Sequence, residues 1–112
     1  MKNKIYGDKG EAKAVAFLKK NKKKILQTNY KNILGEIDII FKDKDFIVFC
    51  EVKSRSSEKF GRASLAVNTQ KQNKIRNVAL FYLKEHKLLE TAVRFDVLEV
   101  YEDEINHIEN AF

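Results

Sequence analysis

Three charged side chains, Asp38, Glu51 and Lys53, fall inside two segments that otherwise have the composition of β-strands. Asp38 lies between isoleucines, and Glu51 follows the apolar run 46–50. Burying a carboxylate without a partner costs several kcal/mol, so acids at such positions need a cation or a hydrogen-bond network. The pattern therefore predicts a site built on carboxylates within a sheet.

The register of the two strands is expected to bring these residues together. If they form a hairpin centred on Lys44 and Asp45, Asp38 lies directly opposite Glu51, with Cβ atoms roughly 5 Å apart. Lys53 follows on the same face, because side chains alternate along a strand. Two carboxylates that close repel each other unless a positive charge lies between them. Either Lys53 or a divalent cation could supply it, and Mg²⁺ commonly takes one or two carboxylates plus waters and phosphate oxygens.

An acid on one strand and Glu-x-Lys on the next suit the hydrolysis of a phosphodiester. A divalent metal would lower the pKa of a bound water and polarise the phosphoryl oxygen. Lys53 would orient that water or stabilise charge that develops in the transition state. A cross-strand salt bridge between Lys53 and the two acids, without a catalytic role, explains the spacing equally well.

Length and composition predict one domain, residues 1–112, of a soluble cytoplasmic protein. A chain of 112 residues, 44% of them hydrophobic, suits a single modest core. No apolar run approaches the roughly 18 residues of a membrane span, and the lysine-rich N-terminus has no signal-peptide core. The lone Cys50 excludes an internal disulfide and a multi-cysteine zinc site, and we expect it in the core. His86 and His107 are expected to be exposed.

Basic residues are concentrated in two parts of the chain. The net charge is +6, yet residues 1–34 hold ten basic and two acidic side chains and residues 68–94 hold six and two. Residues 95–112 hold six acidic side chains and no basic one. Basic segments on either side of a neutral middle are typical of a protein that binds polyanions. A lysine-rich surface that only aids solubility is the alternative.

The hydrophobic periodicity predicts an α/β fold with the order α-β-β-β-α-β, in which one mixed sheet is flanked by helices. The expected elements are a helix from Asp8 to about Asn21, strands over 25–30, 36–41 and 46–53, a helix from Asn68 or Thr69 to His86, and a strand over 91–101. The strand over 46–53 is the most apolar stretch and is expected at the centre of the sheet.

Two further expectations concern the second strand and the C-terminus. Ile37, Ile39 and Phe41 alternate and are expected to share one buried face, followed by a hairpin loop over 42–45. The acidic tail, about 102–112, is expected to lie at the periphery. It could mask the basic surface, contact a partner chain, or be a solvated end.

Two sets of basic residues are candidates for binding a phosphate backbone. Arg55, Lys59 and Arg62 lie in the polar connection directly after Lys53, and functional residues are common on loops held by rigid strands. Lys71 and Lys74 give the second helix a polar face. An ordinary solvated helix face explains this second pair as well.

Five short motifs, taken together, resemble a known family. They are Gly7-x-x-Gly10-Glu11, Gly35-Glu36-Ile37-Asp38, Glu51-Val52-Lys53-Ser54-Arg55, Phe60-Gly61 and Arg94-Phe95-Asp96-Val97. In this order, over nearly the whole chain, they resemble the YraN-like family of small bacterial proteins, described as predicted endonucleases. That family is similar to archaeal Holliday-junction resolvases and to the restriction-endonuclease-like PD-(D/E)xK superfamily.

The resemblance implies a restriction-endonuclease-like fold and a set of site residues. Asp38 and Glu51 would ligate Mg²⁺ or Mn²⁺, and Lys53 would be the catalytic lysine. Glu11 matches the helical glutamate that joins the active site in resolvase-like members, which makes it a further candidate metal ligand. Gln70 matches a polar position that often supports the site.

Several of these assignments have alternatives. Glu11 could instead form a capping box with Asp8 at the start of the first helix, and Gln70 could be an exposed residue of a first helical turn. Glu36 could be a further ligand or only a neighbour of the site. Ile37 stands where the superfamily has a proline, a departure that leaves the assignment intact.

These inferences predict a metal-dependent DNA endonuclease that leaves 5′-phosphates, as the superfamily usually does. Its lysines would hold the backbone without reading bases. Branched DNA, a recombination or repair intermediate, is the expected substrate by fold-level analogy, and resolvase-like enzymes usually act as symmetric dimers. Two alternatives stay open: a non-catalytic nucleic-acid-binding module of the same fold, and a basic module that docks on an acidic protein.

Overall fold

The computed structural model describes residues 2–54 and 67–112, with side chains from residue 10 onward. The elements are α1 (Lys2–Lys20), β1 (Lys24–Asn32), β2 (Gly35–Asp43), β3 (Phe46–Ser54), α3 (Thr69–Glu85), β4 (Ala92–Tyr101) and β5 (Glu104–Ile108). The α/β class and the predicted α-β-β-β-α-β order are confirmed, and β5 is an additional strand. Neither α1 nor α3 is long and apolar enough to cross a membrane.

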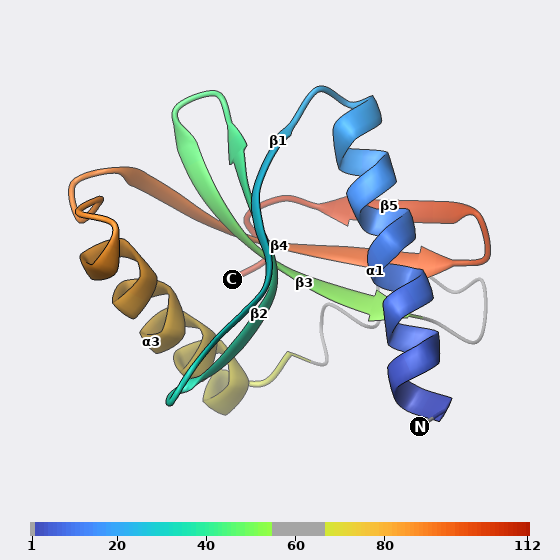
Figure 1. Ribbon diagram of the computed structural model, residues 1–112, viewed down its shortest axis with the longest axis horizontal. Helices are drawn as coiled ribbons and strands as arrows, with labels where there is room; N and C mark the ends of the chain where they lie inside the picture. The colour runs from blue at the N-terminus through green and yellow to red at the C-terminus, as the bar shows by residue number, and fades with distance from the viewer. Residues whose placement is uncertain (1, 55–66) are drawn as a thin grey trace.

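The strands of the described residues form one mixed sheet in the order β1-β2-β3-β4-β5 (Figure 1). β3 is central, as predicted. β3 and β4 are parallel, whereas the other neighbouring pairs are antiparallel. Parallel neighbours need a long crossover connection, and α3 belongs to the crossover between β3 and β4.

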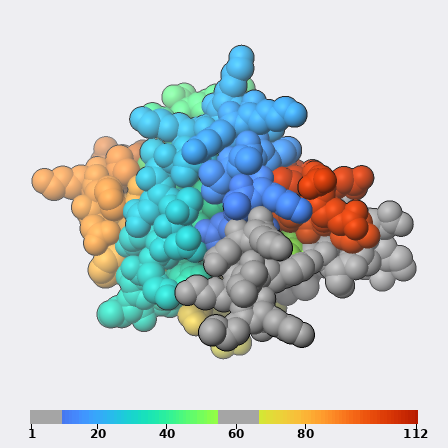
Figure 2. Space-filling view, turned by 45° about the vertical axis from the view of Figure 1, so that its right-hand side comes forward, coloured from blue at the N-terminus to red at the C-terminus, as the bar shows by residue number. Residues whose placement is uncertain are grey.

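The two helices cover opposite faces of the sheet. Along β3, Val48 and Cys50 pack in the cluster that contains α1 residues, whereas Ile47 and Phe49 pack in the cluster that contains α3 residues. This is the alternation expected of a strand buried on both faces. In the space-filling view, α1 lies between the β1–β2 hairpin and the β4–β5 hairpin (Figure 2). Cys50 is buried and unpaired, as predicted.

Helix α1 begins at Lys2, six residues before the predicted start at Asp8. The predicted capping box is therefore wrong, because Asp8 and Glu11 both lie inside the helix. Residues 2–7 include no proline that would stop the helix. Gly10 has a packing role instead: a Cβ atom there would collide with Oγ of Ser54 at the end of β3. The glycine lets α1 approach β3 closely, and Glu11 follows it.

The predicted register of β2 and β3 is confirmed. The ladder ends with Ile39 opposite Cys50, so Asp38 and Glu51 occupy the next opposed positions. The turn is shorter than the predicted loop over 42–45, because β2 continues to Asp43 and only two residues separate it from β3. Two-residue turns match the twist of a hairpin when the backbone adopts positive φ, as Lys44 does at 55°.

Ile37 does not share a face with Ile39 and Phe41, so that prediction is wrong. Ile39 and Phe41 pack in the cluster on the α1 face, whereas Ile37 packs in the cluster on the α3 face. The prediction assumed an unbroken strand alternation. The ladder with β3 stops at Ile39, and the side chains beyond it follow a different pattern.

The predictions of a peripheral acidic tail and of an exposed His107 are also wrong. Glu104–Ile108 forms β5, which pairs with β4. Nε2 of His107 lies 2.7 Å from Oδ2 of Asp96, which is completely buried and also accepts two hydrogen bonds from Arg94. A buried carboxylate needs such partners, and the C-terminal segment supplies one of them.

Candidate functional site

Asp38 lies at the point where β2 and β3 stop pairing. The backbone N–H of Val52 donates a hydrogen bond to Oδ2 of Asp38 over 2.8 Å. The carboxylate thus accepts a donor of β3 just beyond the last paired residues, Ile39 and Cys50. This bond fixes the Asp38 side chain beside Glu51 on the neighbouring strand.

Glu51 destabilises the charged form of the neighbouring Asp38 carboxyl group. Burial and, after it, the negative charge of Glu51 raise the pKa of Asp38 to about 7, although the hydrogen bond from Val52 acts to lower it. The charges of Glu11 and Glu36 act in the same direction as Glu51. Poor solvation and a nearby like charge are the two causes that raise a carboxyl pKa, and a bound cation would relieve both.

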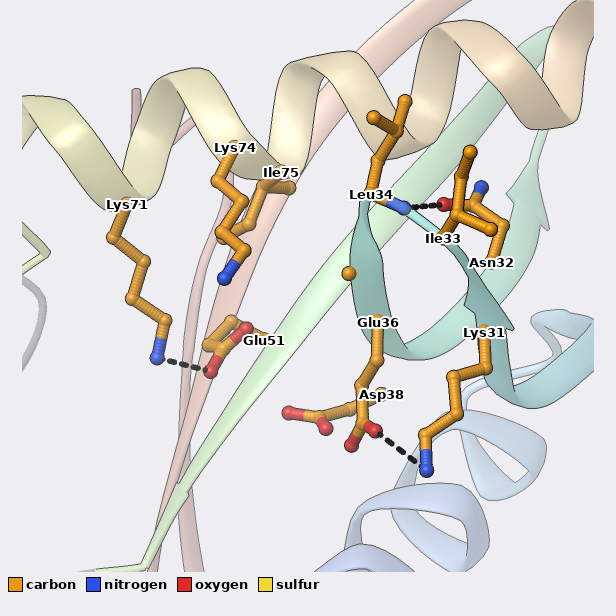
Figure 3. Close-up of a pocket in the computed structure, with 11 residues that line it drawn as sticks. Lys31, Asn32, Ile33, Leu34, Glu36, Asp38, Glu51, Lys71, Lys74 and Ile75 are labelled. Carbon is orange, nitrogen blue, oxygen red and sulfur yellow. Dashed lines mark hydrogen bonds and ion pairs between the residues drawn. The ribbon is translucent and has the colours of Figure 1, made fainter.

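Lys71 partly neutralises this acidic pair. Its Nζ lies 2.9 Å from Oε1 of Glu51, whose side chain is only 13% exposed (Figure 3). The start of α3 positions the lysine, because Oδ1 of the N-cap residue Asn68 accepts a hydrogen bond from the Lys71 N–H. Burial acts to lower the pKa of Lys71, but the hydrogen bond and the attraction of Glu51 raise it.

Lys53 approaches the same carboxylate from β3. Its Nζ lies 4.0 Å from Oε1 of Glu51. Burial and the positive charge of Lys71 lower the pKa of Lys53, against the attraction of Glu51 and Asp38. Glu51 therefore lies between two lysines, one from β3 and one from α3. The predicted grouping of Asp38, Glu51 and Lys53 is thus present in the structure.

A pocket of about 510 Å³ opens beside these groups (Figure 3). It lies between α3 and the β1–β2 hairpin and is lined by Lys31, Asn32, Ile33, Leu34, Gly35, Glu36, Asp38, Glu51, Lys71, Lys74 and Ile75. Glu36 is paired with Lys31 across the hairpin, at 3.6 Å. The pocket therefore combines acidic groups at its base with three lysines around them.

Comparison with known sequences assigns the chain to a family. The model of "Uncharacterised protein family UPF0102" matches residues 10–100. The chain belongs to the UPF0102 family. This is the YraN-like group of predicted endonucleases, so the resemblance inferred from the motifs is confirmed.

Relatives in the UPF0102 family match over nearly their whole length. A UPF0102 protein of Clostridioides difficile is 51% identical, and the alignment covers all of both chains. A UPF0102 protein of Thermodesulfovibrio yellowstonii is 48% identical over 95% of this chain and 94% of its own. One of Alkaliphilus oremlandii is 50% identical over 98% of this chain and 99% of its own.

The structure places the other predicted UPF0102 site residues in different surroundings. Lys74 lines the pocket. Gln70 is exposed on α3 and does not line this pocket. Glu11 lines a second pocket between α1 and β1, and its charge acts on Asp38. Arg55, Lys59, Arg62 and the Phe60-Gly61 motif lie outside the described residues.

The acidic pair fits a hard divalent cation. Asp38 and Glu51 offer carboxylate oxygens, which Mg²⁺ and Mn²⁺ prefer, and Mg²⁺ commonly takes only one or two carboxylates from the protein. Among residues 10–54 and 67–112, no group of three or more His, Cys, Asp or Glu side chains has an arrangement that could hold a metal. Asp38 and Glu51 could therefore hold a cation only as a pair of carboxylates, and Glu11 as a third ligand stays a prediction.

Three features of the pocket were not found from the sequence. Lys71 was a candidate for phosphate contact, but its ion pair with Glu51 was not foreseen. Ile33, Leu34 and Lys31 also line the pocket, and the sequence pattern indicated no individual function for any of them. The one available signal was the position of two large apolar residues directly before Gly35, between the strands expected over 25–30 and 36–41.

Proposed function

We propose that this UPF0102 protein is a metal-dependent DNA endonuclease. One observation supports the proposal above all: Asp38 and Glu51 are held side by side in a poorly solvated site, and the pKa of Asp38 is raised to about 7. Burial and the neighbouring carboxylate disfavour the charged form of Asp38, and a bound cation would relieve both effects. Strongly perturbed carboxyl groups in a pocket are typical of functional sites.

Each residue has a role in the proposed reaction. Asp38 and Glu51 would hold Mg²⁺ or Mn²⁺, and the hydrogen bond from Val52 keeps Asp38 oriented for this. When bound, such an ion supplies Lewis-acid polarisation of the phosphate and lowers the pKa of water. Lys53, whose pKa is lowered, would orient the attacking water and stabilise the negative charge that develops on the phosphate.

The surroundings of the pocket suit a nucleic acid. Lys31, Lys71 and Lys74 line it, and the chain carries a net charge of +6. Lysines bind phosphates as point charges and carry no base specificity. The similarity of the YraN-like group to Holliday-junction resolvases favours branched DNA as the substrate and a symmetric dimer as the active form. The buried, unpaired Cys50 accords with the reducing cytoplasm as its location.

Cleavage of a panel of labelled DNAs tests the proposal. Linear, single-stranded, flapped and four-way-junction DNAs are incubated with the wild-type protein in Mg²⁺, Mn²⁺ or chelator. We expect metal-dependent cleavage, lowered about 100-fold or more by Asp38→Asn and by Lys53→Ala. Asp45→Asn and Lys44→Ala make the same changes in the exposed β2–β3 turn and serve as matched controls.

The other outcomes identify the alternative functions. DNA binding without cleavage by the wild-type protein would favour a non-catalytic clamp. Absence of both binding and cleavage would favour docking on an acidic protein. Binding to DNA should also weaken steeply with salt, because phosphate contacts release counterions, and a flat salt response would contradict contact with the backbone.

A further inference from the structure

Two apolar side chains project from the tip of the β1–β2 hairpin beside the acidic pair. Ile33 is 94% exposed and Leu34 is 42% exposed. Both line the same pocket as Asp38 and Glu51, on the side opposite Lys71 (Figure 3). Ile33 is the most exposed large hydrophobic residue in the described part of the chain. A single exposed isoleucine needs no explanation, but a pair at the mouth of a charged pocket does.

The tip is held in a fixed conformation by hydrogen bonds. The Leu34 N–H donates to Oδ1 of Asn32 over 2.8 Å, and Nδ2 of Asn32 donates to the hydroxyl of Tyr30 over 3.3 Å. Tyr30 is itself buried and packs edge-on against Tyr82 of α3, with ring centroids 5.1 Å apart. The apolar residues are therefore presented by a turn that is anchored in the core.

Gly35 holds the same turn against α3. Its φ is +150°, which favours glycine, and a Cβ atom there would lie 3.2 Å from Cε of Lys74 and 3.2 Å from Cγ2 of Val78. The hairpin tip and the N-terminal half of α3 thus form one packed unit. Ile33, Leu34 and the pocket lysines keep their relative positions because both elements are fixed together.

The charges around the tip indicate what it faces. Lys31, Lys71 and Lys74 line the pocket next to it and would bind phosphates. An apolar group set among phosphate-binding lysines faces the interior of the nucleic acid, where the bases lie. Apolar side chains reach that interior by insertion between bases, which unstacks them.

We propose that Ile33 and Leu34 form an apolar wedge that contacts unstacked bases, so that the protein selects DNA with an interrupted base stack over fully paired duplex. Unstacking costs a few kcal/mol in intact duplex and least where bases are already mismatched or unpaired. The wedge therefore discriminates by the cost of insertion, not by base identity. It rests on the proposed function only in taking DNA as the ligand.

Equilibrium binding without cleavage tests the wedge. The wild-type protein, in chelator, is titrated into a duplex with an internal bulge and into its fully paired counterpart, each with 2-aminopurine beside the bulge position. We expect about tenfold tighter binding to the bulged duplex, and a rise in 2-aminopurine fluorescence as the base is unstacked. The double variant Ile33→Ser, Leu34→Ser should lose both, and should keep the salt dependence that the lysines provide.

Leu89→Ser is the matched control. Leu89 is 55% exposed beyond the end of α3 and does not line this pocket, so its replacement should leave the preference and the fluorescence unchanged. Thermal unfolding of all three proteins verifies the fold, and little change is expected because serine replaces exposed side chains.

Three results would overturn the wedge. The first is an unchanged preference for bulged DNA in the double variant, and the second is an equal loss of affinity for both DNAs. The third is a wild-type dimer that the double variant turns into a monomer in sedimentation, which would make the tip a contact between copies. The nuclease proposal is tested separately, by cleavage of DNA. A protein that binds DNA through the hairpin tip but never cleaves it would contradict the nuclease proposal and still support the wedge.

Discussion

Nζ of Lys71 lies 2.9 Å from Oε1 of Glu51, so α3 supplies a positive charge to a carboxylate that we propose as a metal ligand. The ion pair spans the crossover connection and links α3 to β3. A divalent cation at Asp38 and Glu51 would meet this lysine both as a like charge and as a competitor for the same oxygen. Lys71 and a metal ion therefore oppose each other at Glu51.

Replacing Lys71 should separate metal affinity from DNA affinity. In Lys71→Gln we expect Mn²⁺ to bind about three- to tenfold more tightly, because a like charge is removed and Glu51 is freed. Binding to DNA should weaken, because one phosphate contact is lost, and its salt dependence should fall by about one charge. Calorimetry with Mn²⁺ and salt titrations of DNA binding measure the two effects.

Lys74→Gln provides the matched control. Lys74 lines the same pocket but has no ion pair with Glu51 among the described contacts. The control should weaken DNA binding by a similar factor and change Mn²⁺ affinity less than Lys71→Gln does. Equal effects of both substitutions on Mn²⁺ would show that only the overall charge of the pocket matters.

The acidic pair could be predicted from the sequence because the register of a hairpin depends only on the position of its turn. Once a turn at Lys44 and Asp45 is assumed, opposed positions follow by counting, and Asp38 and Glu51 come together. The approach of Lys71 depends on where α3 lies on the sheet. Neither spacing nor composition specifies that packing, so the ion pair with Glu51 needed the structure.

The errors in the fold have a similar origin. The expected position of Ile37 was wrong because the period-2 alternation of β2 is interrupted between Ile39, where the ladder with β3 ends, and Ile37, which is still paired with β1. β5 was missed because its acidic surroundings suggested solvent. His107 of β5 contacts Asp96 of β4, and the burial of that acid can be seen only after β4 has been placed in the sheet.

The raised pKa of Asp38 predicts a stability cost that depends on pH. Between the ordinary value near 4 and the folded value of about 7, the folded state holds more protons than the unfolded state. Stability therefore falls as pH rises through this window and levels off above it. In chelator, Asp38→Asn should be more stable than the wild-type protein by about 2 kcal/mol at pH 8.

The pH series supplies the control for that substitution. The difference in free energy of unfolding, measured with urea, should shrink toward zero at about pH 4, where both residues are neutral. Asp45→Asn, in the exposed turn, should give a small difference. A stabilisation by Asp38→Asn that is the same at pH 8 and pH 4 would indicate better packing of the amide, not removal of a charge.

Metal binding should show the opposite pH dependence. Below about pH 7 a metal ion must displace the proton of Asp38, so its affinity should rise by up to about tenfold per pH unit and level off above this value. Mn²⁺ titrations between pH 5.5 and 8.5, a range chosen to bracket that pKa, measure this. Affinity that is constant over the range would place the metal away from Asp38.

Asp38 and Asp96 differ in the hydrogen-bond and charge partners of their carboxyl groups, and this difference distinguishes the proposed functional acid from the structural one. Asp96 is fully buried and Asp38 is half-buried, yet their pKa values move in opposite directions. Burial acts to raise the pKa of Asp96, but hydrogen bonds from His107, Arg94 and the Asn110 N–H lower it overall. Asp96 is satisfied by the protein itself, whereas Asp38 faces further carboxylates and lacks a comparable set of cations.

Asp96→Asn should therefore destabilise the protein without affecting the metal site. Breaking a buried ion pair typically costs about 3–5 kcal/mol, and we expect a loss near the lower figure because Arg94 keeps its contact with Asp43 at 3.0 Å.

The lowered pKa of Asp96 means that its stabilisation is present above pH 4 and is lost as the pH falls below that value. Urea unfolding at pH 7 measures the loss, and Mn²⁺ affinity should stay within about twofold of the wild-type value, because Asp96 does not line the pocket that contains Asp38 and Glu51. A variant of normal stability, or one that loses Mn²⁺ affinity while folded, would contradict a purely structural role for Asp96.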